Sequence, residues 1–160
     1  MLNEILKVLQ DDARATPEQI AARTGMPADQ VAKLIGEAEK DRTILKYHAL
    51  INWEKVNNEQ VWALIEVKVT PQKDVGFDSI AERIYHFPQT QSVYLISGSY
   101  DLFVLVAGKS NREIADFVSQ KLSHIDGVHE TFTQFVLKRY KEEGEIIDGK
   151  ENMKRQPVIL

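Results

Sequence analysis

The sequence predicts an α+β protein: an N-terminal winged helix-turn-helix followed by a ferredoxin-like βαββαβ domain that pairs into a dimeric β-sandwich. Three observations lead to this prediction. Apolar residues follow a helical spacing in the N-terminal third, strand and helix patterns alternate from residue 61, and the predicted sheet is apolar on both faces. We therefore expect a helix-turn-helix domain over 1–51, a linker over 52–60, a ferredoxin-like domain over 61–140 and a tail over 141–160.

The N-terminal part carries three short amphipathic stripes. The second has clear ends, because Thr16 and Gln19 form a capping box and Gly25 favours the left-handed turn that ends a helix. The third covers residues 27–40, and the β-forming segment 42–51 follows it as a predicted strand. The inward positions of the first and third stripes are Leu2, Ile5, Leu6, Leu9, Val31, Leu34, Ile35 and Ala38. Three short helices, a tight glycine turn and a strand favour a winged helix-turn-helix over a generic three-helix bundle.

Strand and helix patterns alternate in the C-terminal part. Strands are predicted over 61–69, 91–97, 102–107 and about 128–137, and helices over 77–84 and from Ser110 or Asn111 to Ile125. The polar stretch 142–154 is predicted to be a loop. The apolar stretch 156–160 is open to three interpretations: an added edge strand, a contact with a neighbouring chain, or a frayed end.

The predicted sheet has no polar face. On the first strand, Trp62 and Leu64 face the opposite side from Val61 and Ala63, and the run 102–107 is apolar throughout. Two helices cover only one face of a ferredoxin-like sheet, so the other face needs a second cover. The same face of a second copy supplies one, and we predict an obligate homodimer. The alternative is a buried central strand whose neighbours are exposed to water.

The composition excludes several classes of protein. The chain has 43% hydrophobic and 28% charged residues, no cysteine and a formal net charge of -4. Absence of cysteine excludes disulfides, Cys-ligated zinc and a cysteine nucleophile. Neither a membrane-spanning run nor a signal peptide is visible, and we expect a cytoplasmic protein with no membrane partner. The acidic balance argues against a general nucleic-acid coat protein, so DNA binding requires a local patch or several copies.

Enzymatic chemistry is not predicted. The chain has no dinucleotide-binding glycine motif, no P-loop and no G-x-S-x-G, so neither catalytic residues nor a cofactor are expected. Among the four histidines, His124 and His129 flank a predicted turn, but none pairs with a carboxylate in helical register. We therefore expect no metal site.

The third helix is the candidate DNA-recognition element, because the second helix of a helix-turn-helix enters the major groove. Gln30 can read adenine, and Lys33 can reach guanine or phosphate. The expected DNA contacts are Arg14, Arg23, Asp29, Gln30, Lys33, Lys40 and Arg42, with Lys46 as a further phosphate contact. Between Met1 and His48 the sequence has seven basic and eight acidic side chains. One copy should therefore bind weakly, and an oligomer should restore affinity.

The turn between the second and third strands is the candidate effector pocket. Its backbone N–H groups can hold a carboxylate, and Asp101 can pair with an α-ammonium group. The expected effector contacts are Gly98, Ser99, Tyr100, Asp101, Thr131 and Thr133. The alternative is that these residues only build an ordinary turn and an ordinary strand.

These segments resemble the Lrp/AsnC, or feast/famine, family of transcriptional regulators over about 140 residues. The resemblance rests on the order and spacing of the segments 5–14, 20–26, 44–52, 93–101 and 122–133. Within them, Ser97-Gly98-Ser99-Tyr100-Asp101 looks like the family's glycine-to-aspartate turn, and Ile125-Asp126-Gly127-Val128 looks like its last helix–strand unit. The sequence departs from the family at Ala32, Gly36 and Glu37, where members often carry Arg or Lys.

The resemblance implies a DNA-binding regulator that forms dimers and then tetramers or octamers on double-stranded DNA. It also implies a small effector, such as an amino acid, bound between dimers near the turn residues given above. Two alternative functions remain open. One is a DNA-incompetent partner that assembles with a basic paralogue, which the charge balance favours. The other is a small ferredoxin-like enzyme, which leaves the N-terminal helices without a role and offers only Glu66 and Lys68 as charges on its first strand.

Overall fold

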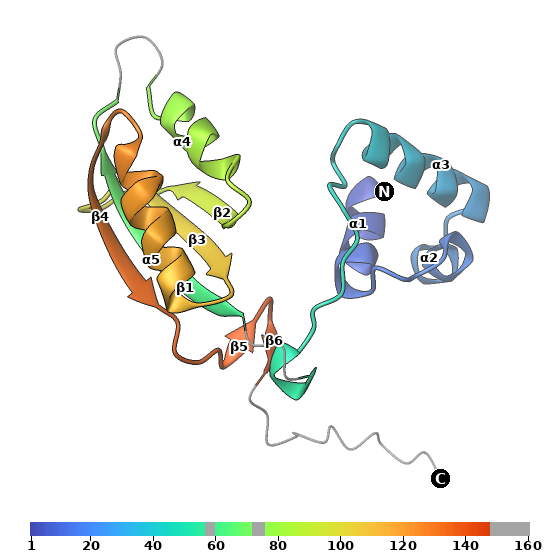
Figure 1. Cartoon of the computed structure of the whole chain (residues 1–160). Coiled ribbons are helices and arrows are strands. Elements are labelled where there is room, and N and C mark those ends of the chain that lie inside the picture. The colour runs from blue at the N-terminus through green and yellow to red at the C-terminus, as the bar shows by residue number, and fades with distance from the viewer. Residues whose placement is uncertain (57–59, 72–75, 148–160) are drawn as a thin grey trace. The chain divides into compact units, whose positions relative to one another are not determined.

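The computed structural model describes residues 1–56, 60–71 and 76–147, which belong to an N-terminal unit, Met1–Ile51, and a C-terminal unit, Asn52–Leu160 (Figure 1). The N-terminal unit consists of α1 (Leu2–Asp11), α2 (Pro17–Thr24) and α3 (Ala28–Lys40), as the apolar stripes predict. Its core is made of apolar side chains from all three helices and the connection between α1 and α2. The buried members are Ile5, Leu9, Ala15, Ile20 and Val31.

The ends of α2 follow the predicted signals. The Gln19 backbone N–H donates to Thr16 Oγ1 at 3.3 Å, and the Thr16 backbone N–H donates to Gln19 Oε1 at 2.9 Å, which completes the capping box. Gly25 has φ +73, a left-handed conformation that an L side chain rarely adopts. This sharp stop fixes the turn between α2 and α3, and with it the position of α3 in the motif.

The strand predicted over 42–51 does not form, so this expectation was wrong. Arg42 adopts a left-handed conformation with φ +63, and residues 45–51 have no strand pairing. The Ile44 N–H donates to the carbonyl of Ala38 at 2.8 Å, and the Tyr47 hydroxyl donates to Glu39 at 2.9 Å. The beginning of the segment is therefore held against α3. A strand needs a neighbouring strand for its backbone hydrogen bonds, and this unit provides none within its described residues.

The C-terminal unit has the predicted βαββαβ order. Its elements are β1 (Val61–Val69), α4 (Asp78–Tyr85), β2 (Thr90–Leu95), β3 (Leu102–Gly108), α5 (Asn111–Gln120) and β4 (Val128–Phe135). The strands form one antiparallel sheet in the order β2-β3-β1-β4. β2 and β3 are joined by a hairpin turn, whereas the connections through α4 and α5 cross over, so β3 and β1 lie in the middle and the two edges are β2 and β4.

Three details differ from the sequence-based expectation. The helix expected to run to Ile125 ends at Gln120, and a 3-10 turn, Leu122–His124, follows it. The last strand ends at Phe135 rather than near residue 137. The polar stretch predicted as a loop begins within a short hairpin of β5 (Lys141–Glu142) and β6 (Glu145–Ile146), and the apolar residues 156–160 lie outside the described part of the chain.

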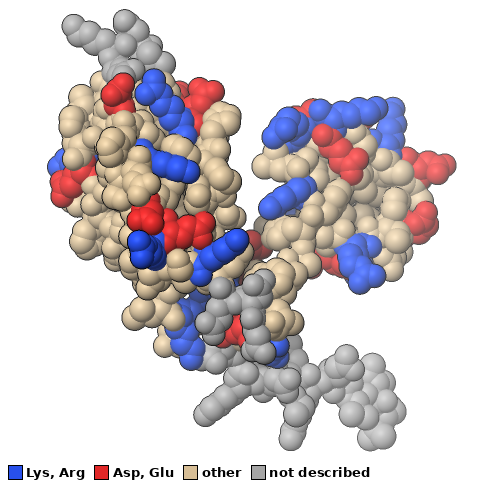
Figure 2. Space-filling view, viewed as in Figure 1, with Lys and Arg blue, Asp and Glu red and all other residues tan. Residues whose placement is uncertain are grey.

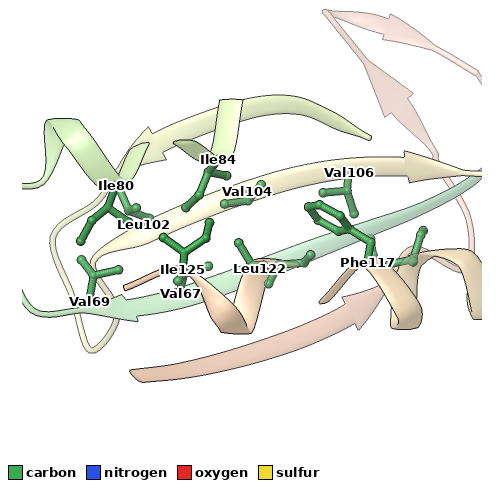
Figure 3. Packing of buried hydrophobic residues seen from close by; sticks show 13 residues of the cluster. Val67, Val69, Ile80, Ile84, Leu102, Val104, Val106, Phe117, Leu122 and Ile125 are labelled. Atoms are coloured by element: carbon green, nitrogen blue, oxygen red, sulfur yellow. The ribbon is translucent and has the colours of Figure 1, made fainter. Parts of the chain in front are cut away.

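Both helices cover the same face of the sheet. Alternate residues of β1 and β3 pack there against α4, α5 and the 3-10 turn (Figure 3). The fully buried strand residues are Ala63, Ile65, Val67, Leu102, Val104 and Val106, and Ile80, Ile84, Ile114 and Leu122 cover them. This core fixes the strand register, because a slip of one residue would turn every apolar side chain to the other face. Within the described residues, no helix is long and apolar enough to cross a membrane.

Candidate functional site

The seven predicted DNA contacts are all exposed, and four of them belong to α3. Gln30 and Lys33 are separated by one helical turn, and Lys40 lies two turns beyond Lys33, so all three share one side of the helix. Val31 and Ala38 are buried on the opposite side. Asp29, at the start of the helix, is exposed beside them. α3 therefore presents a polar stripe that a groove of DNA can accept, while its apolar side holds the helix in the unit.

Acidic side chains dilute the positive charge of this surface. The Lys33 ammonium lies 4.0 Å from Glu37 Oε1, and both side chains are more than half exposed. Lysine or arginine and acidic side chains are interspersed on the visible face of the N-terminal unit (Figure 2). Arg14 is exposed shortly after the end of α1, and Arg23 is exposed in the last turn of α2. Arg42 is exposed in the turn after α3. No purely basic patch forms on the side shown, which agrees with the balance of charges in the sequence.

The turn over residues 98–101 is fixed to β1 by Asp101. The Asp101 carboxylate accepts a hydrogen bond from the Val69 N–H at 2.9 Å, and the Asp101 N–H donates to the carbonyl of Val67 at 3.1 Å. The Asp101 carbonyl also accepts from the Ile96 N–H at 2.9 Å. Asp101 therefore has a structural role that sequence reasoning did not assign. Gly98 and Ser99 are exposed beside it, and Tyr100 and Asp101 are partly buried.

The side chain of Tyr100 links the turn to β4. Its hydroxyl donates to Glu130 Oε1 at 3.2 Å. Partial burial raises the pKa of the Tyr100 hydroxyl above its usual value, and the hydrogen bond to Glu130 and the charge of Glu66 raise it further. Glu130 was missed from the sequence. Strand alternation could have found it, because Glu130 lies opposite Lys68 on the face that the helices leave open.

Thr131 and Thr133 lie on the other side of the sheet from Glu130. They stand opposite Val67 and Ile65 in the ladder between β1 and β4, on the helix-covered face, and both are partly buried. Leu102, which follows the turn, also lies opposite Val67, from the β3 side. β1 therefore separates the two threonines from the turn, and the structure does not gather all six predicted effector contacts in one place.

The open face of the sheet carries large apolar side chains on all four strands, as the sequence predicts. It is not wholly apolar, because Glu66, Lys68, Glu130 and Gln134 also lie on it. In the ladders, Trp62, Leu64, Phe103, Leu105 and Phe132 lie on this face. Tyr94 joins them from β2, with its ring 6.4 Å from that of Phe103. Tyr94 is 55% exposed and Phe132 is 51% exposed, and no described segment of the C-terminal unit covers them.

Comparison with known protein families finds two models that together span most of the chain. Residues 3–45 match a winged helix-turn-helix DNA-binding family, and residues 62–146 match the Lrp/AsnC ligand-binding domain. The chain is 47% identical over 153 residues to the uncharacterized HTH-type transcriptional regulator YugG of Bacillus subtilis strain 168, covering 95% of this chain and 92% of the relative. It is 26% identical to the leucine-responsive regulatory protein of Rhizobium meliloti strain 1021, covering 87% of this chain and 88% of that protein.

Solved structures give the same result. The transcriptional regulator NMB0573 of Neisseria meningitidis, in complex with L-methionine, is 25% identical and superposes with a TM-score of 0.69, covering 88% of this chain and 90% of that chain. The leucine response regulatory protein LrpA of Mycobacterium tuberculosis shares the fold with a TM-score of 0.74 at 23% identity, covering 91% of this chain and 97% of its own. With a helix-turn-helix unit joined to a βαββαβ sheet in this order, the chain belongs to the Lrp/AsnC family of DNA-binding transcriptional regulators, which are not enzymes.

Proposed function

We propose that this regulator acts as a homodimer whose two open sheet faces pack together, and that the dimer binds operator DNA under the control of a small effector. The cluster of large apolar side chains on the open face carries the proposal. Burying one large apolar side chain contributes about 1.5–3 kcal/mol, and the face presents six of them on adjacent strands. An exposed apolar patch of this kind marks an interaction surface. In a two-fold symmetric dimer, the same patch of each copy packs against that of the other, so one surface supplies both sides of the interface.

Dimerisation also compensates for the weak charge of the DNA-binding unit. Seven basic side chains against eight acidic ones supply little attraction for phosphate over residues 1–48. Two linked units make the second binding event intramolecular, which raises the overall affinity without new contacts. In this proposal Gln30 and Lys33 read base edges, and Arg14, Arg23, Lys40 and Arg42 contact phosphates. Association into tetramers or octamers would raise the overall affinity for DNA further in the same way.

For the effector, we propose an amino acid at the turn over residues 98–101. Support comes from the relative of Neisseria meningitidis that was solved with L-methionine. The Asp101 carboxylate accepts one backbone hydrogen bond, which leaves it capacity for an α-ammonium group. Thr131 and Thr133 lie on the helix-covered face of the sheet. We therefore propose that the ligand contacts the turn residues, Tyr100 among them, rather than the hydroxyl groups of the two threonines.

One combined experiment tests the proposal. The full chain is measured by light scattering and by gel-shift on the promoter of its own gene, with and without each amino acid. We expect a dimer or a multiple of it, a retarded complex with that promoter, and a change in affinity or assembly with at least one amino acid. A stable monomer would refute the packing of the two sheets, and a lack of response to every amino acid would refute the effector.

The acidic balance of residues 1–48 supports one second candidate, a subunit that binds DNA only together with a more basic paralogue. Footprinting with the purified chain alone separates the two. Protection of a defined sequence supports the homodimer as the DNA-binding species. Protection that appears only after a basic relative is added supports the mixed assembly.

A further inference from the structure

A cavity lies at the opposite end of β1 from the turn over residues 98–101. Figure 1 shows that the start of β1, the end of β4 and the start of α5 meet at one end of the sheet. A cavity of about 490 Å³ lies there, lined by Trp53, Trp62, Phe135, Lys138 and Arg139 among others. Val61 and Val69 are eight positions apart along β1, which is roughly 26 Å of extended chain. The cavity is therefore distinct from the turn that we propose for the amino acid.

Aromatic and cationic groups are concentrated in this cavity. The chain contains only two tryptophans, and both line it. The Arg139 guanidinium lies 5.4 Å from the centre of the Trp62 ring. Among the described residues of the lining, Lys138 and Arg139 outnumber the single acidic residue, Glu54. α5 begins there at Asn111, so the positive end of its dipole adds to the charge.

Backbone contacts hold the lining in place. The Val136 N–H donates to the carbonyl of Trp62 at 2.8 Å, which fixes the chain after β4 beside the start of β1. The Asn52 side-chain amide donates to the carbonyl of Ile147 at 3.3 Å, which ties the segment before Trp53 to the hairpin of β5 and β6. The volume is within the usual range for small-molecule sites, which combine apolar walls with a few charged groups.

We propose that this cavity binds a small anion with a planar ring, of the aromatic carboxylate class. The indole and phenyl rings offer flat apolar walls to the ring of the ligand. Arg139, whose fork of N–H donors matches a carboxylate, supplies the anion contact together with Lys138. This inference does not depend on the effector site at residues 98–101.

Tryptophan emission tests the proposal directly, because every tryptophan of the chain lines the cavity. Benzoate is titrated into the full chain, with benzyl alcohol as the neutral ring and acetate as the anion without a ring. We expect a saturable change in emission with benzoate, and binding at least about tenfold weaker for the other two compounds. Arg139→Gln should weaken benzoate binding about tenfold, whereas Lys141→Gln, which removes a cation just outside the lining, should not.

Several results would overturn the inference. An emission that does not saturate with benzoate, or equal benzoate affinity in Arg139→Gln and the parent chain, excludes the site. Displacement of benzoate by L-methionine would assign the signal to the amino-acid site. Because Trp62 also lies on the open face, light scattering is run on each variant, and dissociation of the dimer by Arg139→Gln would mean that a second copy fills the cavity. If Arg139→Gln does not fold, Lys138→Gln replaces it, and unchanged affinity there also refutes the proposal.

Discussion

Lys33 is the residue on which the proposed DNA contact can be tested with least disturbance. Its ion pair with Glu37 joins two largely exposed side chains, and such pairs contribute little to stability. We expect Lys33→Ala to weaken operator binding about fivefold to tenfold in a gel-shift, because one cation is lost from the side of α3 that we propose to face the groove.

The matched control is Lys7→Ala, which removes an exposed cation from α1. It should have a smaller effect on operator affinity, and both variants should keep the oligomeric state of the parent. An unchanged affinity and unchanged sequence preference in Lys33→Ala would remove this residue from the DNA interface.

Asp41 gives a pH-dependent prediction for the N-terminal unit. The Thr43 N–H donates to Asp41 Oδ1 at 2.9 Å, and this hydrogen bond is the main reason why the Asp41 pKa is lowered from 3.8. Because the folded-state pKa is lowered, the stabilising contribution is present above pH 3.8 and is lost as the pH falls through the folded-state value. In an NMR titration, the Asp41 carboxyl and the Thr43 amide should share a midpoint below 3.8. A midpoint at or above that value would mean that the hydrogen bond is absent in solution.

Among the structural elements, the connection between the 3-10 turn and β4 depends on one glycine. Gly127 has φ +94, and a Cβ atom there would lie 2.7 Å from Ile80 Cδ1 on α4 and 3.2 Å from the carbonyl oxygen of Thr70. We therefore expect Gly127→Ala to lower the free energy of unfolding by about 2–3 kcal/mol. Urea unfolding at a fixed protein concentration, followed by tryptophan emission, measures this change.

Gly144→Ala is the control for this substitution. Gly144 also has a left-handed φ, +88, but a Cβ atom there meets nothing within 4 Å. It therefore carries the backbone strain without the clash against α4, and its loss of stability should be clearly smaller. Equal losses in the two variants would show that the close packing of Gly127 against Ile80 is not what makes this glycine necessary.

For the whole molecule, the decisive surface is the open face of the sheet. Leu105 lies near its middle, opposite Leu64 on β1 and Ser92 on β2. We expect Leu105→Asp to weaken dimerisation about 100-fold or more, because a two-fold interface would bury two unpaired carboxylates. Sedimentation velocity over a range of concentrations measures the shift, and operator binding should fall with it.

Ile146→Asp serves as the comparison, because Ile146 is 61% exposed in the β5–β6 hairpin, which is not part of the four-stranded sheet. It should leave the dimer intact. If Leu105→Asp remains a dimer with unchanged affinity, the two copies associate through another surface, and the proposed packing of the sheets is excluded.

Local signals in the sequence determined most of the elements. Capping at Thr16, the left-handed turn at Gly25 and the apolar stripes of α1 and α3 act within one or two helical turns, so they are visible without the fold. Strand alternation likewise divided the residues of β1 between two opposite faces, and the structure decided that the face of Ala63, Ile65 and Val67 is the one that packs against the helices. The same reasoning failed for residues 42–51, because strand formation depends on a neighbouring backbone that β-forming side chains do not guarantee.

The composition of the candidate sites was decided only by the tertiary structure. Register across β1 placed Thr131 on the covered face, joined Tyr100 to Glu130, and brought Trp53, Trp62 and Arg139 to one cavity from segments up to 86 positions apart in numbering. The sequence by itself determined the order of the elements and the presence of apolar side chains on both sheet faces, since these follow from side-chain periodicity along one segment. Which side chains meet depends on strand order and register, which are set by the packing of the whole domain.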